Sequence, residues 1–219
     1  AALARSTAKA GARLIFLSSI AAQSPPSSNL VLTEYDVCLP STAYGRSKRN
    51  AEIEVAAAGG RYVILRPSLI YGKAAKGNMR KLIRLARLPV PLPFGALTNK
   101  RSLLAIDNLI SAIDLIIQRD DINNETFLVA DATSVSLAEI IASLRHGIGR
   151  TSNLISIPPA LLSALFRMCW MSAEWDKLAG NLELSIAKLN SIGYSPAVAT
   201  PEGLAAMTAR DSDLGAALK

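Results

Sequence analysis

Three polar side chains could together carry out a proton transfer: Tyr44, Lys48 and Ser19. Tyr44 and Lys48 are four residues apart, which places both side chains on the same face of a helix. An ammonium group beside a phenol favours the phenolate, and a phenolate can act as a general base. A Tyr-x-x-x-Lys pair alone is a weak signal, because any amphipathic helix can carry it. The prediction therefore depends on the elements that surround the pair.

The surrounding pattern is that of a βαβ unit. Residues 13–17 predict a short buried strand, and Ser18 and Ser19 follow at its carboxyl end. A second such strand, residues 61–65, follows the Tyr/Lys helix and ends at Pro67. Ligands bind at the carboxyl ends of strands in open α/β sheets, so the polar residues gather where a substrate would lie.

Several stretches, in order along the chain, resemble the extended short-chain dehydrogenase/reductase family, and within it the NAD-dependent epimerases and dehydratases of nucleotide sugars. The matching stretches are 14–20, 44–48, 65–72, 101–109, 193–196 and 200–204. Residues 91–95, ahead of 99–102, are most similar to the bacterial branch that makes surface-polysaccharide sugars. The resemblance implies an α/β fold: the C-terminal half of a Rossmann-like parallel sheet, with a smaller α/β substrate-binding lobe.

The family pattern predicts two lobes. Residues 1–72 and 101–122 would be the remaining part of an NAD(P)-binding Rossmann domain, and residues 73–100 and 123–219 would form the substrate-binding lobe. Within that second lobe we expect a strand at 126–130 and then a helix from Ser136 to Gly147. Asp107 and Asn108 are typical of a helix-capping pair.

Members of the family open with a strand and a Gly-x-x-Gly-x-x-Gly turn, which places the cofactor pyrophosphate at a helix N-terminus. No such turn occurs in the 219 residues, and the first residue is Ala1 rather than methionine. We therefore expect a chain that lacks the N-terminal, glycine-rich half of the nucleotide-binding domain.

The resemblance assigns roles residue by residue. Tyr44 matches the catalytic tyrosine that exchanges a proton with the sugar hydroxyl. Lys48 matches the lysine that supports it and hydrogen-bonds the nicotinamide ribose, and Ser19 matches the residue that hydrogen-bonds the reacting oxygen. Tyr44 and Lys48 are thus expected to contact the cofactor as well, and Pro67 would lie beside the nicotinamide.

Substrate-binding roles follow in the same way. Asn78 and Arg101 match positions that contact the nucleotide diphosphate, and Phe94 matches a position near the uracil. Family dehydratases carry an Asp-Glu pair directly after the catalytic serine or threonine, whereas Ile20 and Ala21 stand there in this sequence. A 4,6-dehydratase is therefore disfavoured.

The implied activity is that of an NAD(P)-dependent epimerase or 4-keto reductase acting on a UDP-sugar in the cytoplasm, and the resemblance allows a homodimer. The choice between NAD and NADP, and between the two reactions, stays open. Two alternatives also remain: a hydroxysteroid- or flavonoid-type reductase of the same superfamily, and a non-catalytic scaffold that binds no cofactor.

Composition excludes several other classes. The two cysteines, Cys38 and Cys169, lack metal-ligand spacing and His146 is the sole histidine, so we expect neither a metal site nor a Ser-His-Asp triad. The net charge of +7 comes partly from a basic amphipathic segment at 76–88, but aromatic interleaving and nucleic-acid motifs are missing, so we expect no nucleic-acid partner.

The apolar stretch 160–171 is too short to span a bilayer. We favour an amphipathic helix of the substrate lobe there, with an interfacial membrane contact as the minority interpretation.

Overall fold

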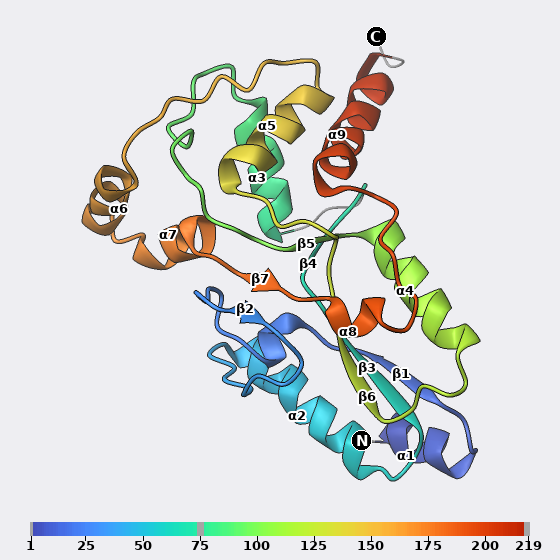
Figure 1. Cartoon of the computed structure of the whole chain (residues 1–219). Coiled ribbons are helices and arrows are strands. Elements are labelled where there is room, and N and C mark those ends of the chain that lie inside the picture. Colours follow the sequence, from blue (N-terminus) through green and yellow to red (C-terminus); the bar gives the residue numbers. More distant parts are fainter. Residues whose placement is uncertain (1, 74–76, 217–219) are drawn as a thin grey trace.

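A three-stranded parallel sheet forms the first lobe of the computed structural model, which describes residues 2–73 and 77–216 (Figure 1). Its strands are β1 (Leu14–Leu17), β3 (Tyr62–Pro67) and β6 (Glu125–Val129), in the order β1-β3-β6. Leu17 pairs with Leu65 across the first two strands. Short apolar strands of this kind are typical of parallel sheets that helices cover, so the predicted βαβ unit is confirmed.

Helices cover both faces of β3. Side chains alternate along a strand, so Val63 and Leu65 point to one face while Ile64 and Arg66 point to the other. Val63 and Leu65 belong to an apolar core shared with α4 (Ile106–Gln118). On the opposite face the Arg66 side chain forms an ion pair with Glu52 of the Tyr/Lys helix. A buried ion pair therefore attaches that helix to the sheet. The longer helices of this lobe are α1 (Ala2–Lys9), α2 (Ala43–Ala57) and α4.

The strand predicted at 126–130 belongs to the first lobe, and its assignment to the substrate lobe is wrong. It is observed as β6, which pairs with β3 in parallel from Val63 opposite Glu125 to Pro67 opposite Val129. The helix α8 (Ala187–Asn190) also lies here, because Leu189 joins the same core as Phe127. Residues distant in sequence thus complete the sheet and its cover.

The predicted capping pair Asp107 and Asn108 is also a wrong interpretation. The N-cap of α4 is Ala105, which makes no side-chain capping bond. Asn108 is fully buried, and its amide nitrogen donates to Asp131 Oδ1 at 2.7 Å and to the Val198 carbonyl at 2.9 Å. Distant partners, rather than the helix's own first turn, take up its hydrogen bonds.

Two small parallel sheets lead from the first lobe into the second. The first pairs β2 (Val31–Leu32) with β7 (Glu183–Leu184), and the second pairs β4 (Leu69–Tyr71) with β5 (Leu103–Ala105). A single turn of 3₁₀ helix, η1 (Ile20–Ala22), directly follows Ser19.

Five helices surround the apolar core of the second lobe. They are α3 (Gly77–Arg87), α5 (Leu137–Gly147), α6 (Pro159–Met168), α7 (Ser172–Ala179) and α9 (Thr200–Ala216). The helix predicted between Ser136 and Gly147 is confirmed as α5, and Ser136 and Glu139 form a capping box at its start. Among the residues that the structure describes, no helix has the length and apolar character needed to traverse a bilayer.

Candidate active site

The Tyr/Lys helix, α2, begins at Ala43, directly after its N-cap Thr42. The Thr42 hydroxyl accepts a hydrogen bond from the Gly45 amide at 2.9 Å and caps the first turn of α2. Tyr44 then lies in the first turn and Lys48 in the second, with the Lys48 ammonium 5.9 Å from the centroid of the Tyr44 ring. The four-residue spacing therefore brings the two groups together, as expected.

Lys48 ties the helix to the end of β1. Its ammonium donates to the Leu17 carbonyl at 3.0 Å and lies 5.3 Å from the centroid of the Phe16 ring. Both distances to aromatic rings fall within the range of a cation–π contact. The ammonium is thus fixed at the carboxyl end of the strand, next to the residues that follow it.

Ser19 reaches the same place through a close backbone contact. A Cβ on Gly45 would lie 2.1 Å from the Ala21 carbonyl oxygen, so only glycine lets α2 approach η1 this closely. Ser19 is the N-cap of η1, and its hydroxyl accepts a hydrogen bond from the Ala21 amide at 3.2 Å. The contact places the first turn of α2, which carries Tyr44, beside the turn that carries Ser19. The Tyr44 side chain is 58% exposed, so its phenol is open to a ligand.

Pro67 lies at the corresponding point of the neighbouring strand. Leu17 pairs with Leu65, and Ser19 and Pro67 each come two residues later along parallel strands. The four residues assigned to catalysis and cofactor contact, namely Ser19, Tyr44, Lys48 and Pro67, therefore gather at one edge of the sheet. Their chemical roles remain predictions.

A buried ionic network lies next to this edge of the sheet. Its central residue, Glu52, was not predicted. Arg66 donates to Glu52 Oε1 at 2.9 Å through Nε and to Oε2 at 2.7 Å through Nη2. The Ser18 hydroxyl donates to Oε1 at 2.6 Å, and Arg49 donates to Oε2 at 3.0 Å. Arg66 also donates to the Gln23 side chain at 2.8 Å. The network connects α2, β3 and the segment on both sides of Ser19.

The charges of this network stabilise each other. Burial by itself would raise the pKa of Glu52, but the hydrogen bonds from Arg66 and Ser18 outweigh it and hold that pKa below its usual range. Burial likewise acts to lower the pKa of Arg66, and Glu52 more than compensates, so the net shift is upward. Glu52 is therefore a carboxylate over the ordinary pH range.

A signal for Glu52 was present in the sequence. Tyr44, Lys48 and Glu52 recur every four residues, so they share a face of α2. An arginine inside a buried strand also needs a carboxylate partner, and Arg66 is such an arginine. The two observations together would have paired Glu52 with Arg66.

The residues assigned to substrate binding lie in and near the second lobe. Arg101 is partly buried, and its guanidinium donates to the Gly180 carbonyl at 2.8 Å and to the Pro26 carbonyl at 3.2 Å. Burial lowers the pKa of Arg101. Pro26 lies seven residues after Ser19, so Arg101 links the loop that leaves the catalytic edge to the end of α7.

Asn78 is exposed in the first turn of α3, and Phe94 is buried in the second core. Nucleotide contact by these residues remains a prediction.

A second buried carboxylate, Asp131, organises the junction of the lobes. Tyr71 and Thr200 donate their hydroxyl groups to its Oδ2, each at 2.9 Å, and the Ala105 amide donates to Oδ1 at the same distance. Asn108 supplies the fourth donor. Burial, together with the charge of Asp131, raises the pKa of Tyr71 far above its usual value, so this phenol stays protonated. It is thus unsuited to act as a base.

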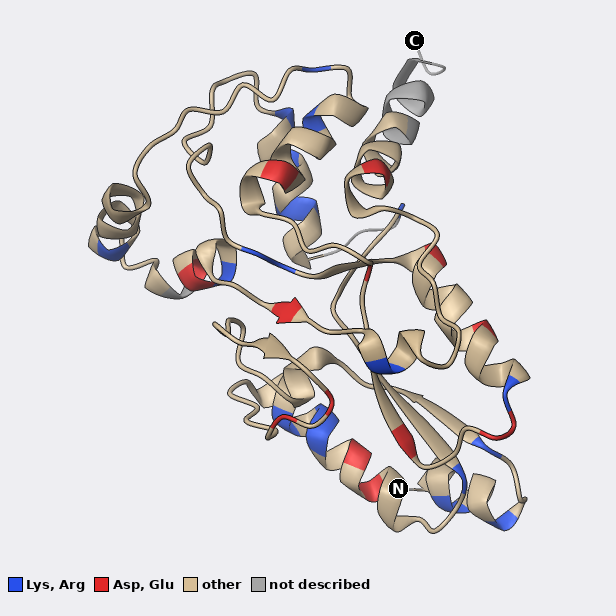
Figure 2. Ribbon diagram, viewed as in Figure 1, with Lys and Arg blue, Asp and Glu red and all other residues tan. Residues whose placement is uncertain are grey.

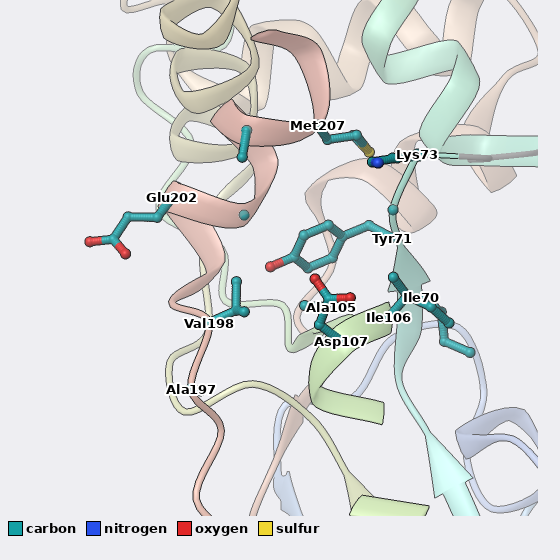
Figure 3. Close-up of a pocket in the computed structure, with 13 residues that line it drawn as sticks. Ile70, Tyr71, Lys73, Ala105, Ile106, Asp107, Ala197, Val198, Glu202 and Met207 are labelled. Atoms are coloured by element: carbon teal, nitrogen blue, oxygen red, sulfur yellow. The ribbon is translucent and has the colours of Figure 1, made fainter. Parts of the chain in front are cut away.

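Beside this junction lies a cleft of about 830 Å³ between β4, the start of α4 and α9 (Figure 3). Tyr71, Ile106, Val198 and Met207 contribute apolar surface, and the charged groups of its lining are Lys73, Asp107 and Glu202. Ser19, Tyr44 and Lys48 are not part of its lining. The cleft is therefore distinct from the candidate active site.

The structure is thus an α/β protein in which Ser19, Tyr44 and Lys48 lie together at the carboxyl ends of parallel strands. Residues 1–130 match the family model described as NAD dependent epimerase/dehydratase family. The chain is also 33% identical over 170 residues to UDP-glucose 4-epimerase of Vibrio cholerae, a match that covers 75% of this chain and 52% of that protein. The chain belongs to the NAD dependent epimerase/dehydratase family, and it spans about half the length of the curated relative it matches.

Solved structures agree on the fold. UDP-glucose 4-epimerase of Thermotoga maritima, determined with UDP-glucose, has a TM-score of 0.71 at 20% identity, covering 99% of this chain and 68% of that one. WbmG of Bordetella bronchiseptica, determined with NAD and UDP, has a TM-score of 0.72 at 17% identity, covering 97% of this chain and 64% of that one. The family resemblance and the Rossmann-like α/β fold class are thereby confirmed.

Proposed function

We propose that this chain supplies the proton-transfer and substrate-binding parts of an NAD(P)-dependent epimerase or 4-keto reductase that acts on a UDP-sugar. The observation that carries the proposal is the position of the Lys48 ammonium, bonded to the last carbonyl of β1 and next to the Tyr44 ring. The relatives named above, which include two UDP-glucose 4-epimerases, support the substrate class.

The residues at this edge fit the nicotinamide end of the cofactor. Tyr44 is exposed, Lys48 uses one of its three donors on Leu17, and Pro67 is a buried apolar ring at the adjoining strand end. Tyr44 and Lys48 would hold the nicotinamide ribose and Pro67 would lie beside the ring. When bound, the cofactor supplies the hydride acceptor or donor.

The side chains themselves would manage the proton. Ser19 would orient the reacting sugar oxygen by a hydrogen bond, and Tyr44 would take the proton from that oxygen or return it. The positive charge of Lys48 would stabilise the negative charge that develops on the Tyr44 oxygen. Glu52 would keep α2 seated on the strand ends while this happens.

The same proposal places the nucleotide diphosphate near Arg101, whose planar guanidinium suits phosphate oxygens. The two carbonyl bonds of Arg101 use two of its five donors. A cytoplasmic location and a homodimer belong to this proposal too, and they rest on the family resemblance alone.

Calorimetric titration with UDP tests the substrate class. Arg101→Ala should weaken UDP binding by about 1.5–3 kcal/mol, the range for a hydrogen bond to a charged group. Lys100→Ala removes a neighbouring exposed cation and serves as the matched control. Thermal melts of both variants would separate lost binding from lost folding. UDP affinity equal to wild type in folded Arg101→Ala protein would favour the hydroxysteroid- or flavonoid-type alternative.

A further inference from the structure

The helix α6 exposes a stripe of large apolar side chains. Leu161, Leu165 and Met168 are 63%, 49% and 73% exposed, and their spacing of four and then three residues puts them on one face. The stripe continues into the turn between α6 and α7, where Trp170 is 96% exposed and Met171 is 46% exposed. We call these five side chains the α6 tip.

The opposite face of α6 accounts for its attachment to the molecule. Leu162 is buried in the second core, and the Phe166 ring packs against Trp175 with 5.3 Å between ring centroids. The helix is therefore apolar on both faces, although only the inner face has a partner among the described residues. A helix that is apolar all round is normally buried on all sides.

The position of the α6 tip favours a planar, fluid partner over a folded one. Figure 1 shows α6 at the outer edge of the molecule, remote from the sheet of β1, β3 and β6. Ten residues of helix are about 15 Å long. A stable protein interface buries roughly 800 Å² on each partner, more than one exposed face of so short a helix offers.

Charge favours an anionic surface. The chain carries a formal charge of +7, and residues 73–101 contain Lys and Arg but neither Asp nor Glu. Arg167 lies on α6 itself (Figure 2). On α7 the pKa of Glu174 is lowered mainly by Lys177, whose ammonium donates to the Glu174 carboxylate at 3.1 Å. The charge of Lys81, on α3, lowers that pKa further. Arg167 is thus a cation on the helix that carries the α6 tip, and Glu174, one of the two carboxylates of α7, is already paired.

We propose that the α6 tip inserts into the headgroup region of an anionic lipid bilayer and holds the protein at that surface without crossing it. Tryptophan favours this interface, because its ring is apolar and its indole N–H remains hydrated. Leucine and methionine would enter the acyl boundary, and Arg167 would reach lipid phosphates. The contact is independent of the proposed enzymatic function.

Co-sedimentation with lipid vesicles tests the proposal on the 219-residue chain. Vesicles of phosphatidylglycerol and phosphatidylcholine in equal parts should bind the protein, whereas pure phosphatidylcholine should bind it weakly, and added salt should reduce binding. Met168→Glu and Trp170→Ser should each lower partitioning by at least about tenfold. Leu30→Glu changes an equally exposed apolar residue outside the α6 tip, and it should leave partitioning unchanged.

Tryptophan fluorescence gives an independent readout. Trp175→Phe leaves Trp170 as the single tryptophan, and its emission should shift to the blue when anionic vesicles are added. Equal vesicle binding by wild type and Met168→Glu would overturn the proposal, as would an unshifted emission. Self-association that Met168→Glu abolishes, with no vesicle binding, would assign the α6 tip to a second copy of the chain instead.

Discussion

Two buried carboxylates, Glu52 and Asp131, organise the described part of this molecule, and their negative charges are stabilised in different ways. Glu52 lies behind the candidate active site between two arginines, Arg66 and Arg49. Asp131 lies at the junction of the lobes and is held by four neutral donors. The side chain of Glu52 is 1% exposed, and Asp131 is 4% exposed.

The difference reflects what each carboxylate positions. Glu52 fixes a helix against strand ends, and Arg66 and Arg49 balance its charge there. Asp131 collects an amide, a carboxamide and two hydroxyl groups from separate segments, so it joins β4, β5, α4 and α9 without adding a cation. Loss of either should therefore damage the molecule, and the lowered pKa of Glu52 makes the stability supplied by its network depend on pH.

The largest effect is expected for Asp131→Ala. The change leaves four buried donors without their acceptor, and each unsatisfied donor costs about 1–3 kcal/mol. The total is on the order of 5 kcal/mol or more, comparable to the whole stability of a typical domain. Denaturant unfolding followed by circular dichroism measures it, with Asp107→Ala, an exposed carboxylate in α4, as control. A loss of less than about 1 kcal/mol would mean that the junction does not depend on Asp131.

Glu52→Gln should cost about 3–5 kcal/mol at neutral pH, because it leaves Arg66 as a buried cation without a charged partner. Glu54→Gln, exposed on the same helix, should be close to neutral. The pKa of Glu52 is lowered in the folded protein, so its contribution is complete above the unfolded value near 4.3 and is lost as pH falls through the folded value. The stability gap between wild type and Glu52→Gln should therefore shrink on acidification. Unfolding curves over a pH series measure it, and a gap that persists in acid would contradict the ionic account.

Gly45→Ala should have a smaller effect on stability, about 1–3 kcal/mol, because the new methyl group must displace the Ala21 carbonyl of η1. Ser47→Ala, exposed on the same helix, provides the comparison and should be neutral or slightly stabilising. The substitution should move Tyr44 relative to Ser19 and leave the Asp131 junction intact. Thermal melts together with NMR shifts near Thr200 would show whether the disturbance stays local.

The sequence predicts the parts of this structure that depend on local pattern. The strands predicted at 13–17 and 61–65, the shared face of Tyr44 and Lys48, and the helix predicted from Ser136 all follow from spacing and residue type over a few positions, and the strands are observed at 14–17 and 62–67. For the same reason the edge that gathers Ser19, Tyr44 and Lys48 could be assembled before the fold was known.

The features that escaped prediction depend on partners far along the chain. The strand β6 pairs with β3 about 60 residues earlier, and Asn108 bonds Val198, 90 residues later. Glu52 can be assigned a role only together with Arg66, which comes 14 residues later. Arg101 shows the same limit, because its observed bonds go to the Pro26 and Gly180 carbonyls, both far from it along the chain. Local sequence pattern does not specify such pairings.

Single-turnover kinetics of Tyr44→Phe test whether Tyr44 is the group that transfers the proton. The measurement uses a chimera in which this chain follows the glycine-rich nucleotide-binding segment of a relative, with NAD(P) bound and a UDP-sugar added. Removal of the phenolic oxygen should lower the rate of cofactor reduction by about 100- to 10,000-fold, the usual contribution of general acid–base catalysis, with cofactor affinity nearly unchanged. Reduction at close to the wild-type rate in the Tyr44→Phe chimera would contradict the account.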